Sequence, residues 1–175
     1  MGKLNQRLPV KLIIGLIFKE NAVYKKAAHL LENKFGKTDF ESKKLPFTYT
    51  GYYIKEFGSS LQRIFLAFEK LIPPEKLPSI KIFTNKIEQE LALNSLRRIN
   101  IDPGYIALAK LVLASTKDYR HRIYLGKGIY AEITLSFRGK TFNPQECTYP
   151  DYRSSEYISI FNKIRQIYAQ QIKNI

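Results

Sequence analysis

The residues best suited to chemistry lie in a predicted β-hairpin spanning Arg122–Phe137. Alternation over Ile129–Phe137 predicts a strand with five apolar residues on one face and polar residues on the other. Gly126-Lys127-Gly128 predicts a three-residue turn that pairs Leu125 with Ile129, because a two-residue turn would set apolar residues opposite polar ones. The polar face, here called the hairpin ledge, then holds Arg122, Tyr124, Tyr130, Glu132 and Thr134.

The hairpin ledge has two interpretations. It is either a solvated sheet face with a cross-strand ion pair contributing at most about 1 kcal/mol, or a ligand platform that combines aromatic stacking with a guanidinium fork. The directly paired Tyr124 and Tyr130 favour the platform. Phosphate contacts from Lys110 and Arg153 would extend it, and Tyr152 lies beside Arg153 in an irregular segment rich in hydrogen-bonding groups.

Carboxylates support a second hypothesis, an Mg²⁺-dependent enzyme acting on a phosphorylated or nucleotide substrate. Asp39, Glu41 and Asp151 are the candidate Mg²⁺ ligands, and Asp102 and Glu132 are further candidates for metal binding or acid–base work. No catalytic residue is assigned, and no cofactor is predicted under the first hypothesis. The single Cys147 excludes an intrachain disulfide, and zinc is disfavoured because the only two histidines are far apart in the sequence.

The composition predicts one basic domain over residues 1–175. The chain is 45% hydrophobic, enough for a core, and 29 Lys+Arg against 15 Asp+Glu give a net charge of +14. Such an excess favours an anionic partner, RNA or a nucleotide, although a Lys-rich, heat-adapted surface is the alternative. Gly36-Lys37-Thr38 is not a phosphate-binding loop, because Leu31 stands where that motif requires glycine.

The N-terminal segment predicts a cytoplasmic protein without a membrane anchor. Met1–Phe18 has the basic start and apolar run of a signal peptide, but Lys11 interrupts the run and no cleavage site follows. Gly2 lacks the hydroxyl residue that myristoylation prefers. The oligomeric state is left open, as is a scaffold role in which the Tyr-rich face meets a protein partner.

Hydrophobic patterns place the elements of the first half. Val10–Phe18 predicts a central strand buried on both faces, followed by a helix that Asn21 caps and Gly36 ends. The alternating Phe47–Thr50 predicts an edge strand, and the aromatic-rich Asp39–Tyr53 around it could also form a wall on which a base or sugar stacks. Further elements are a strand at Gln62–Leu71 and a short extended piece at Ser79–Phe83. Asn85, with Glu88 three residues later, resembles a capping box and predicts the start of a helix that runs to about Leu93.

The second half predicts a strand, two helices and the hairpin. Arg98–Ile101 reads as a strand, after which Asp102 and Pro103 suit the cap and first turn of a buried helix over Tyr105–Thr116. Ser154 or Ser155 is expected to cap the C-terminal helix, which has an apolar stripe. The order predicts an α+β fold: a mainly antiparallel sheet with packed helices, with a possible ferredoxin-like βαββαβ core plus the hairpin and C-terminal helix.

Six segments together resemble the prokaryotic domain-of-unknown-function family numbered 4416. They are DFES (Asp39–Ser42), FTYTGYY (Phe47–Tyr53), FTNKIE (Phe83–Glu88), NIDPGY (Asn100–Tyr105), HRIYLGKGIYAE (His121–Glu132) and TYPDYRS (Thr148–Ser154). The resemblance spans nearly the whole chain and implies an uncharacterised protein, since the family has no established activity, although some members are labelled GTP-binding. The function predicted from the residues is non-enzymatic binding of RNA or nucleotide phosphates.

Overall fold

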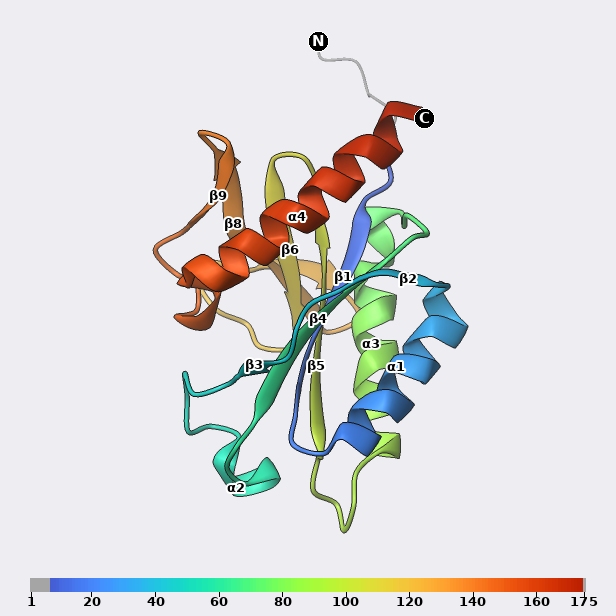
Figure 1. Cartoon of the computed structure of the whole chain (residues 1–175), viewed down its shortest axis with the longest axis vertical. Helices are drawn as coiled ribbons and strands as arrows, with labels where there is room; N and C mark the ends of the chain where they lie inside the picture. Colours follow the sequence, from blue (N-terminus) through green and yellow to red (C-terminus); the bar gives the residue numbers. More distant parts are fainter. Residues whose placement is uncertain (1–6, 175) are drawn as a thin grey trace.

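The protein is built on one open antiparallel sheet, seen in a computed structural model that describes residues 7–174. Three longer helices pack on the sheet: α1 (Asn21–Phe35), α3 (Leu77–Glu90) and α4 (Ser155–Gln171) (Figure 1). The mainly antiparallel α+β fold is therefore confirmed. The start of the segment compared with a signal peptide, including Gly2, lies outside the described residues. None of the described helices is both long and apolar enough to cross a membrane.

The sheet has nine strands in the described part of the chain, in the order β2-β4-β1-β5-β6-β8-β7, with β3 paired to β4 and β9 to β8. Their bounds are β1 Lys11–Phe18, β2 Thr38–Glu41, β3 Leu45–Pro46, β4 Gln62–Phe68, β5 Ile99–Ile106, β6 Lys110–Ser115, β7 Ile123–Gly126, β8 Ile129–Arg138 and β9 Thr141–Pro144. A four-residue helix, α2 (Ile54–Phe57), and 3₁₀ turns at Pro74–Lys76, Asp151–Arg153 and Ile172–Asn174 complete the chain.

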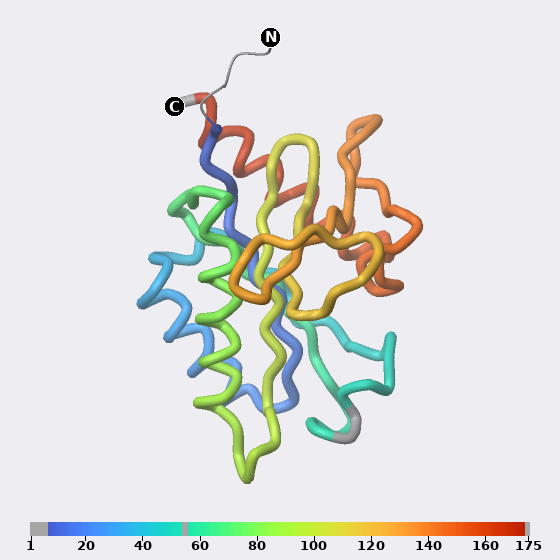
Figure 2. Tube along the Cα trace, turned by 180° about the vertical axis from the view of Figure 1, so that it is seen from behind, coloured from blue at the N-terminus to red at the C-terminus, as the bar shows by residue number. Residues whose placement is uncertain are grey.

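Helices cover both faces of the sheet, so the central strand is buried along its whole length. Helices α1 and α3 lie on one face, seen in Figure 2, and α4 crosses the other, seen in Figure 1. Every residue of β1 is buried, as its continuous apolar run predicted. The apolar stripe of α4 is also confirmed, with Tyr157, Phe161 and Ile164 buried against the sheet, and Ser154 caps the helix by accepting a hydrogen bond from the Tyr157 N–H.

The predicted helix Tyr105–Thr116 is wrong. Strand β5 runs straight through Asp102 and Pro103 to Ile106, and β6 follows at Lys110. An apolar run with no periodicity fits a buried helix as well as two buried strands. Pairing with neighbouring strands therefore determines which of the two forms. Pro103 is tolerated in the strand because pairing with β6 begins only at Gly104, which leaves β5 with a neighbour on one side at the proline.

Three smaller predictions are also wrong. Ser79–Phe83 belongs to α3, which starts before Asn85, so that residue is no cap. The cap position of α1 is Glu20, while the Asn21 side chain accepts a hydrogen bond from Lys44 Nζ at 2.6 Å. Phe47–Thr50 forms a loop after the two-residue β3 rather than an edge strand, because this segment has no strand neighbour beyond Pro46.

The hairpin register is confirmed in part. Tyr124 pairs with Tyr130 and Ile123 with Ala131, but Gly126 rather than Leu125 lies opposite Ile129, because a bulge interrupts β7. A second irregularity leaves Thr134 without a partner on β6. Because of this irregularity the Leu135 side chain lies on the same face of the sheet as Glu132, so the predicted alternation fails beyond Ile133. Ile133 itself is 44% exposed.

Candidate functional site

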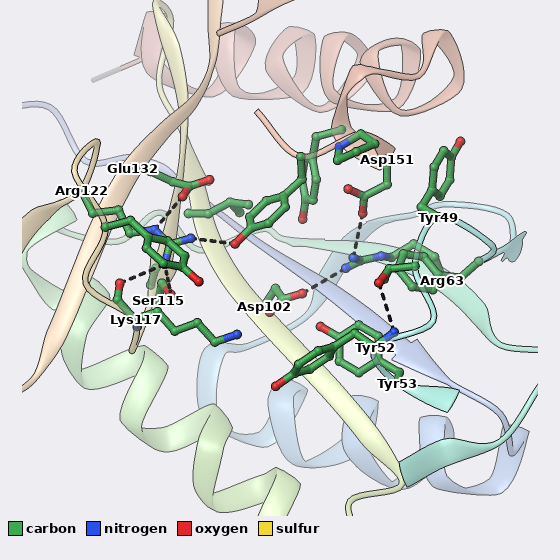
Figure 3. Close-up of a pocket in the computed structure, with 18 residues that line it drawn as sticks. Tyr49, Tyr52, Tyr53, Arg63, Asp102, Ser115, Lys117, Arg122, Glu132 and Asp151 are labelled. Atoms are coloured by element: carbon green, nitrogen blue, oxygen red, sulfur yellow. Dashed lines mark hydrogen bonds and ion pairs between the residues drawn. The ribbon is translucent and has the colours of Figure 1, made fainter. Parts of the chain in front are cut away.

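A pocket forms where β6 separates from β5. The two strands pair only from Gly104 to Ile106 on β5, so Ile99–Pro103 has a neighbour on the β1 side alone. Beyond this point β6 continues alongside β8 and the gap opens into a cavity of about 460 Å³ (Figure 3). It is called the tyrosine pocket here, after the lining residues Tyr49, Tyr52, Tyr53, Tyr119, Tyr149 and Tyr152.

The tyrosine pocket has an aromatic wall supplied by loops. Tyr49, Tyr52 and Tyr53 come from the loop after β3, where the Tyr52 and Tyr53 rings lie 5.0 Å apart. Tyr119 and Tyr149 come from the loops after β6 and before α4, and their rings are 50% and 43% exposed. Half-exposed rings around a cavity offer faces on which a planar ligand stacks. These three loops supply the wall, as the alternative interpretation of Asp39–Tyr53 predicted in part.

A buried arginine, Arg63 of β4, forms the floor. Its Nη1 lies 3.3 Å from Asp102 Oδ2 and its Nη2 lies 3.1 Å from Asp151 Oδ2 (Figure 3). The guanidinium packs against the rings of Phe47 and Phe65, with its Cζ 5.2 and 5.4 Å from their centroids. Two carboxylates thus neutralise a cation that is only 2% exposed, and burial raises the pKa of Asp151.

Gly15 allows this arginine to reach across the central strand. Gly15 lies on β1 between Phe65 of β4 and Asp102 of β5. A Cβ at this position would lie 2.7 Å from Arg63 Nη1. The one glycine in an otherwise bulky apolar strand therefore leaves room for a guanidinium that joins β4 to β5.

Arg122 and Glu132 of the hairpin ledge meet as predicted, but inside the protein rather than facing water. Arg122 Nε donates to Glu132 Oε2 at 2.8 Å, and both side chains are buried. Nη1 donates to Ser115 Oγ at 2.8 Å and to the Lys117 carbonyl at 2.9 Å, and Nη2 donates to Tyr149 Oη at 2.7 Å. These contacts occupy most of its donors, so Arg122 holds the pocket wall together.

Lys117 is the cation left over at the mouth. Its Nζ lies 4.8 Å from the centroid of Tyr52, and this ammonium group forms no salt bridge or hydrogen bond within residues 7–174. The charged lining residues number three of each sign: Arg63, Lys117 and Arg122 against Asp102, Glu132 and Asp151. The pocket is therefore balanced in charge, although the chain as a whole carries +14.

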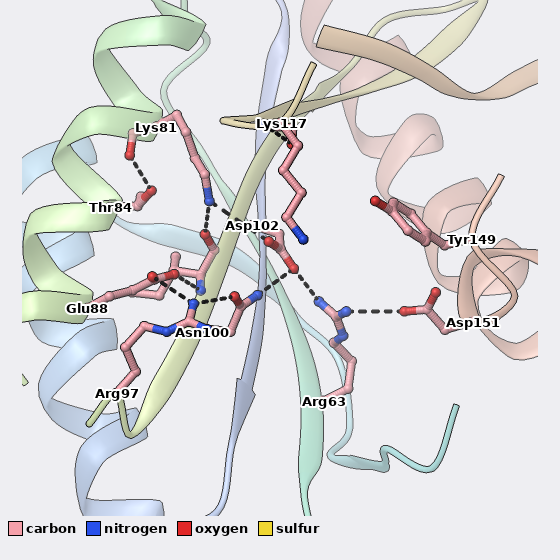
Figure 4. Close-up of polar contacts among 12 residues, drawn as sticks. Arg63, Lys81, Thr84, Glu88, Arg97, Asn100, Asp102, Lys117, Tyr149 and Asp151 are labelled. Atoms are coloured by element: carbon pink, nitrogen blue, oxygen red, sulfur yellow. Dashed lines mark hydrogen bonds and ion pairs between the residues drawn. The ribbon is translucent and has the colours of Figure 1, made fainter. Parts of the chain in front are cut away.

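A second cavity of about 460 Å³, the polar pocket, adjoins the first on the α3 side. Its charged groups form a network (Figure 4). Glu88 Oε1 accepts from the Ile101 N–H at 2.5 Å, Arg97 Nη1 lies 3.4 Å from Glu88 Oε2, and Lys81 Nζ donates to the Ile101 carbonyl at 2.9 Å. Burial raises the pKa of Glu88. Network and pocket flank β5 at its unpaired edge.

The other predicted binding residues lie apart from the lining or have structural contacts. Tyr124 and Tyr130 pack together 5.2 Å apart on the hairpin, outside both pockets, and Lys110 lies at the start of β6, also outside. Thr134 is buried and its hydroxyl donates to Glu132 Oε1 at 3.3 Å. Arg153 donates to three loop carbonyls, those of Thr148, Gln145 and Glu146. Tyr152 lines the tyrosine pocket but is buried, and Arg63 Cζ lies 5.7 Å from its ring centroid.

The candidate Mg²⁺ ligands do not converge. Asp39 pairs with Lys11 at the far end of β1, Glu41 is exposed on β2, and Asp151 pairs with Arg63. Asp102 also pairs with Arg63, so a guanidinium occupies the space between the two aspartates. Within residues 7–174 no three His, Cys, Asp or Glu side chains form a group that could hold a metal ion.

Sequence patterns did not indicate Arg63, Lys117 or the polar network as parts of a site. Arg63 left one signal, a single charge inside the buried run QRIFLAF, where an ion needs a partner. Lys117 left none, because it lies in a polar loop like many other lysines. Glu88 was read only as part of a helix cap.

One protein family matches the chain. The family described as Domain of unknown function (DUF4416) covers residues 8–168, so the chain belongs to it. No curated protein and no solved structure matches the chain.

Proposed function

We propose that this DUF4416 member binds a nucleotide in the tyrosine pocket, with the base stacked among the tyrosine rings and the anionic group beside Lys117. The observation that carries the proposal is the position of Lys117, whose Nζ lies over the Tyr52 ring at the mouth of an aromatic cavity and is not neutralised by a described carboxylate. The proposed binding site is therefore the tyrosine pocket and not the hairpin ledge, because Arg122 of the ledge uses its hydrogen-bond donors for contacts inside the protein.

The shape of the site favours a mononucleotide over an RNA strand. A volume of about 460 Å³ falls in the range of pockets that enclose small ligands. A strand-binding surface would instead present a run of basic side chains along an open face. The lining charges here sum to zero, so the surplus basic residues lie elsewhere on the surface.

The segments that carry the family resemblance support a shared role for these cavities. Five of the six contribute side chains to one or both pockets. They supply Tyr49, Tyr52 and Tyr53 (FTYTGYY), Asn85 and Glu88 (FTNKIE), Asn100 and Asp102 (NIDPGY), Arg122 and Glu132 (HRIYLGKGIYAE), and Tyr149, Asp151 and Tyr152 (TYPDYRS). Segments far apart in the chain thus meet around one opening.

The ferredoxin-like core is proposed as the frame of this site. The order β2-β4-β1-β5 supports it, because β4 lies between β1 and β2 while β1 lies between β4 and β5. The connecting helices, α1 and α3, cover the same face of the sheet. Two interleaved βαβ units of this kind are the defining feature of a ferredoxin-like core.

Calorimetric titration at low salt tests the proposed function. Nucleoside monophosphates are titrated into the protein and into Lys117→Ala, with Lys163→Ala on the exposed side of α4 as the matched control. We expect saturable binding that Lys117→Ala weakens about tenfold, the equivalent of 1.4 kcal/mol, and that Lys163→Ala leaves unchanged. Tyr52→Ala should weaken binding as well, through loss of stacking.

Two results would overturn the proposal. One is the absence of binding by any nucleoside monophosphate at low salt. The other is binding that both lysine variants reduce equally, which would indicate general attraction to a basic surface. Titration with mixed-sequence RNA completes the test. If RNA binds with the same affinity to wild type and to Lys117→Ala, the anionic partner binds on a surface other than the tyrosine pocket.

A further inference from the structure

The tyrosine pocket and the polar pocket form one continuous site. They share lining residues from four segments: Tyr52 and Tyr53, Asp102 of β5, Ala114, Ser115 and Lys117 at the end of β6, and Tyr149 before α4. Lys117 lines both cavities, and Figure 4 shows its side chain extending toward Asp102. A ligand that fills the first cavity therefore extends directly into the second.

The polar pocket leaves a distinct set of groups for that extension. Its three carboxylates and two of its three cations already have partners. Arg97 pairs with Glu56 and Glu88, and Lys81 donates to the Ile101 carbonyl. Asp102 is held by Arg63 and Asn100, with Lys81 Nζ at 3.9 Å. Two amides, Asn85 and Gln89, line the same cavity one turn apart on α3. Neither amide forms a side-chain hydrogen bond with any residue of the described chain.

This mixture of groups selects the chemistry of the occupant. An amide both donates and accepts hydrogen bonds, and a fixed carboxylate accepts them. A hydroxyl group both donates and accepts, so a polyhydroxylated portion satisfies both kinds of partner. A chain of phosphates would face Glu56, Glu88 and Asp102, whose charges have the same sign. Among the lining cations of the described chain, Lys117 is the one whose ammonium has no carboxylate or carbonyl partner.

We infer that the polar pocket binds the sugar of the ligand, so that the site takes a nucleoside or nucleoside monophosphate, with one anionic group at Lys117, in preference to a nucleoside polyphosphate. This inference rests on the proposed function, and it adds which part of the ligand each pocket holds and how much charge the ligand carries.

A ligand series tests the inference with the wild-type protein. The free base, its nucleoside, the monophosphate and the triphosphate are titrated by calorimetry under one low-salt condition. We expect the nucleoside to bind at least tenfold more tightly than the base, the monophosphate more tightly again, and the triphosphate no more tightly than the monophosphate.

The double variant Asn85→Ala/Gln89→Ala locates the sugar contact. It should bring nucleoside affinity down to that of the base while leaving base affinity unchanged, and Lys86→Ala, exposed on the same helix, should change neither. A thermal melt shows whether the double variant is folded. If it is not, the wild-type series still decides.

The outcomes separate this inference from the proposed function. If the base binds and the sugar adds nothing, or if the triphosphate binds tenfold more tightly than the monophosphate, the polar-pocket assignment fails while the tyrosine pocket stands. If no member of the series binds, the proposed function fails and the inference with it.

Discussion

Gly15→Ala tests whether the Arg63 bridge holds the pocket floor. The new Cβ would lie 2.7 Å from Arg63 Nη1 and 3.0 Å from Phe65 Cε1, both in the buried interior. The guanidinium must move, and its 3.3 Å contact with Asp102 across β1 is the first to break. The substitution thus disrupts the ion pair between Arg63 and Asp102 without removing any charged group.

The loss in the free energy of unfolding caused by Gly15→Ala is the sum of three contributions. Disrupting a buried ion pair costs about 3 kcal/mol, and overpacking adds about 1 kcal/mol. Alanine in a strand is favoured over glycine by up to about 1 kcal/mol. The expected net loss in the free energy of unfolding is therefore about 3 kcal/mol, which for a domain of this size lowers Tm by about 6–12 °C.

Urea unfolding of four proteins provides the assay: wild type, Gly15→Ala, Arg63→Ala and the double variant. In the Arg63→Ala background the Cβ meets no guanidinium, so the cost of Gly15→Ala should fall to about 1 kcal/mol or less. A Gly15→Ala protein within about 0.5 kcal/mol of wild type, or a cost that is the same in both backgrounds, would refute the account of the floor.

Three further predictions concern stability. Gly104→Ala should cost at least about 3 kcal/mol or prevent folding, because its Cβ would lie 2.3 Å from the Val112 carbonyl oxygen, and soluble yield with urea unfolding measures it. Ser154→Ala should cost about 1 kcal/mol by removing the α4 cap, whereas Ser155→Ala should cost less, as thermal melts of both variants will show. Burial raises the pKa of Glu88 above 4.5, so the folded state binds the proton more tightly and this group's contribution to stability falls as pH rises through the interval above 4.5. Glu88→Gln should abolish that part of the pH dependence of the unfolding free energy, and an unchanged slope would contradict the assignment.

Elements with a strong local signal could be predicted from sequence. The unbroken apolar run of β1 and the apolar stripe of α4 both indicated their burial correctly. The pairing of Tyr124 with Tyr130 followed from matching like with like across a turn. In each case the pattern over a few neighbouring residues is enough to decide the structure.

Elements whose structure depends on contacts with distant parts of the chain could not be predicted from the sequence. Asp102-Pro103 suits a helix start in isolation, yet β1 pairs with this segment over its whole length and makes it a strand. The pocket depends on such contacts throughout, because Arg63, Asp102 and Asp151 come from three separate parts of the chain. No spacing within one segment predicts that they meet.

The position of the pocket follows from strand pairing. Strand β5 keeps β1 beside it over its full length but has β6 beside it only from Gly104 onward. An unpaired strand edge inside a sheet has to be covered or solvated, and here polar side chains line it. This explains why Asn100 and Asp102 interrupt an otherwise apolar strand, and why Arg63 crosses Gly15 to reach Asp102. The opening between β5 and β6 therefore creates the cavity and requires the charged groups that give it its chemistry.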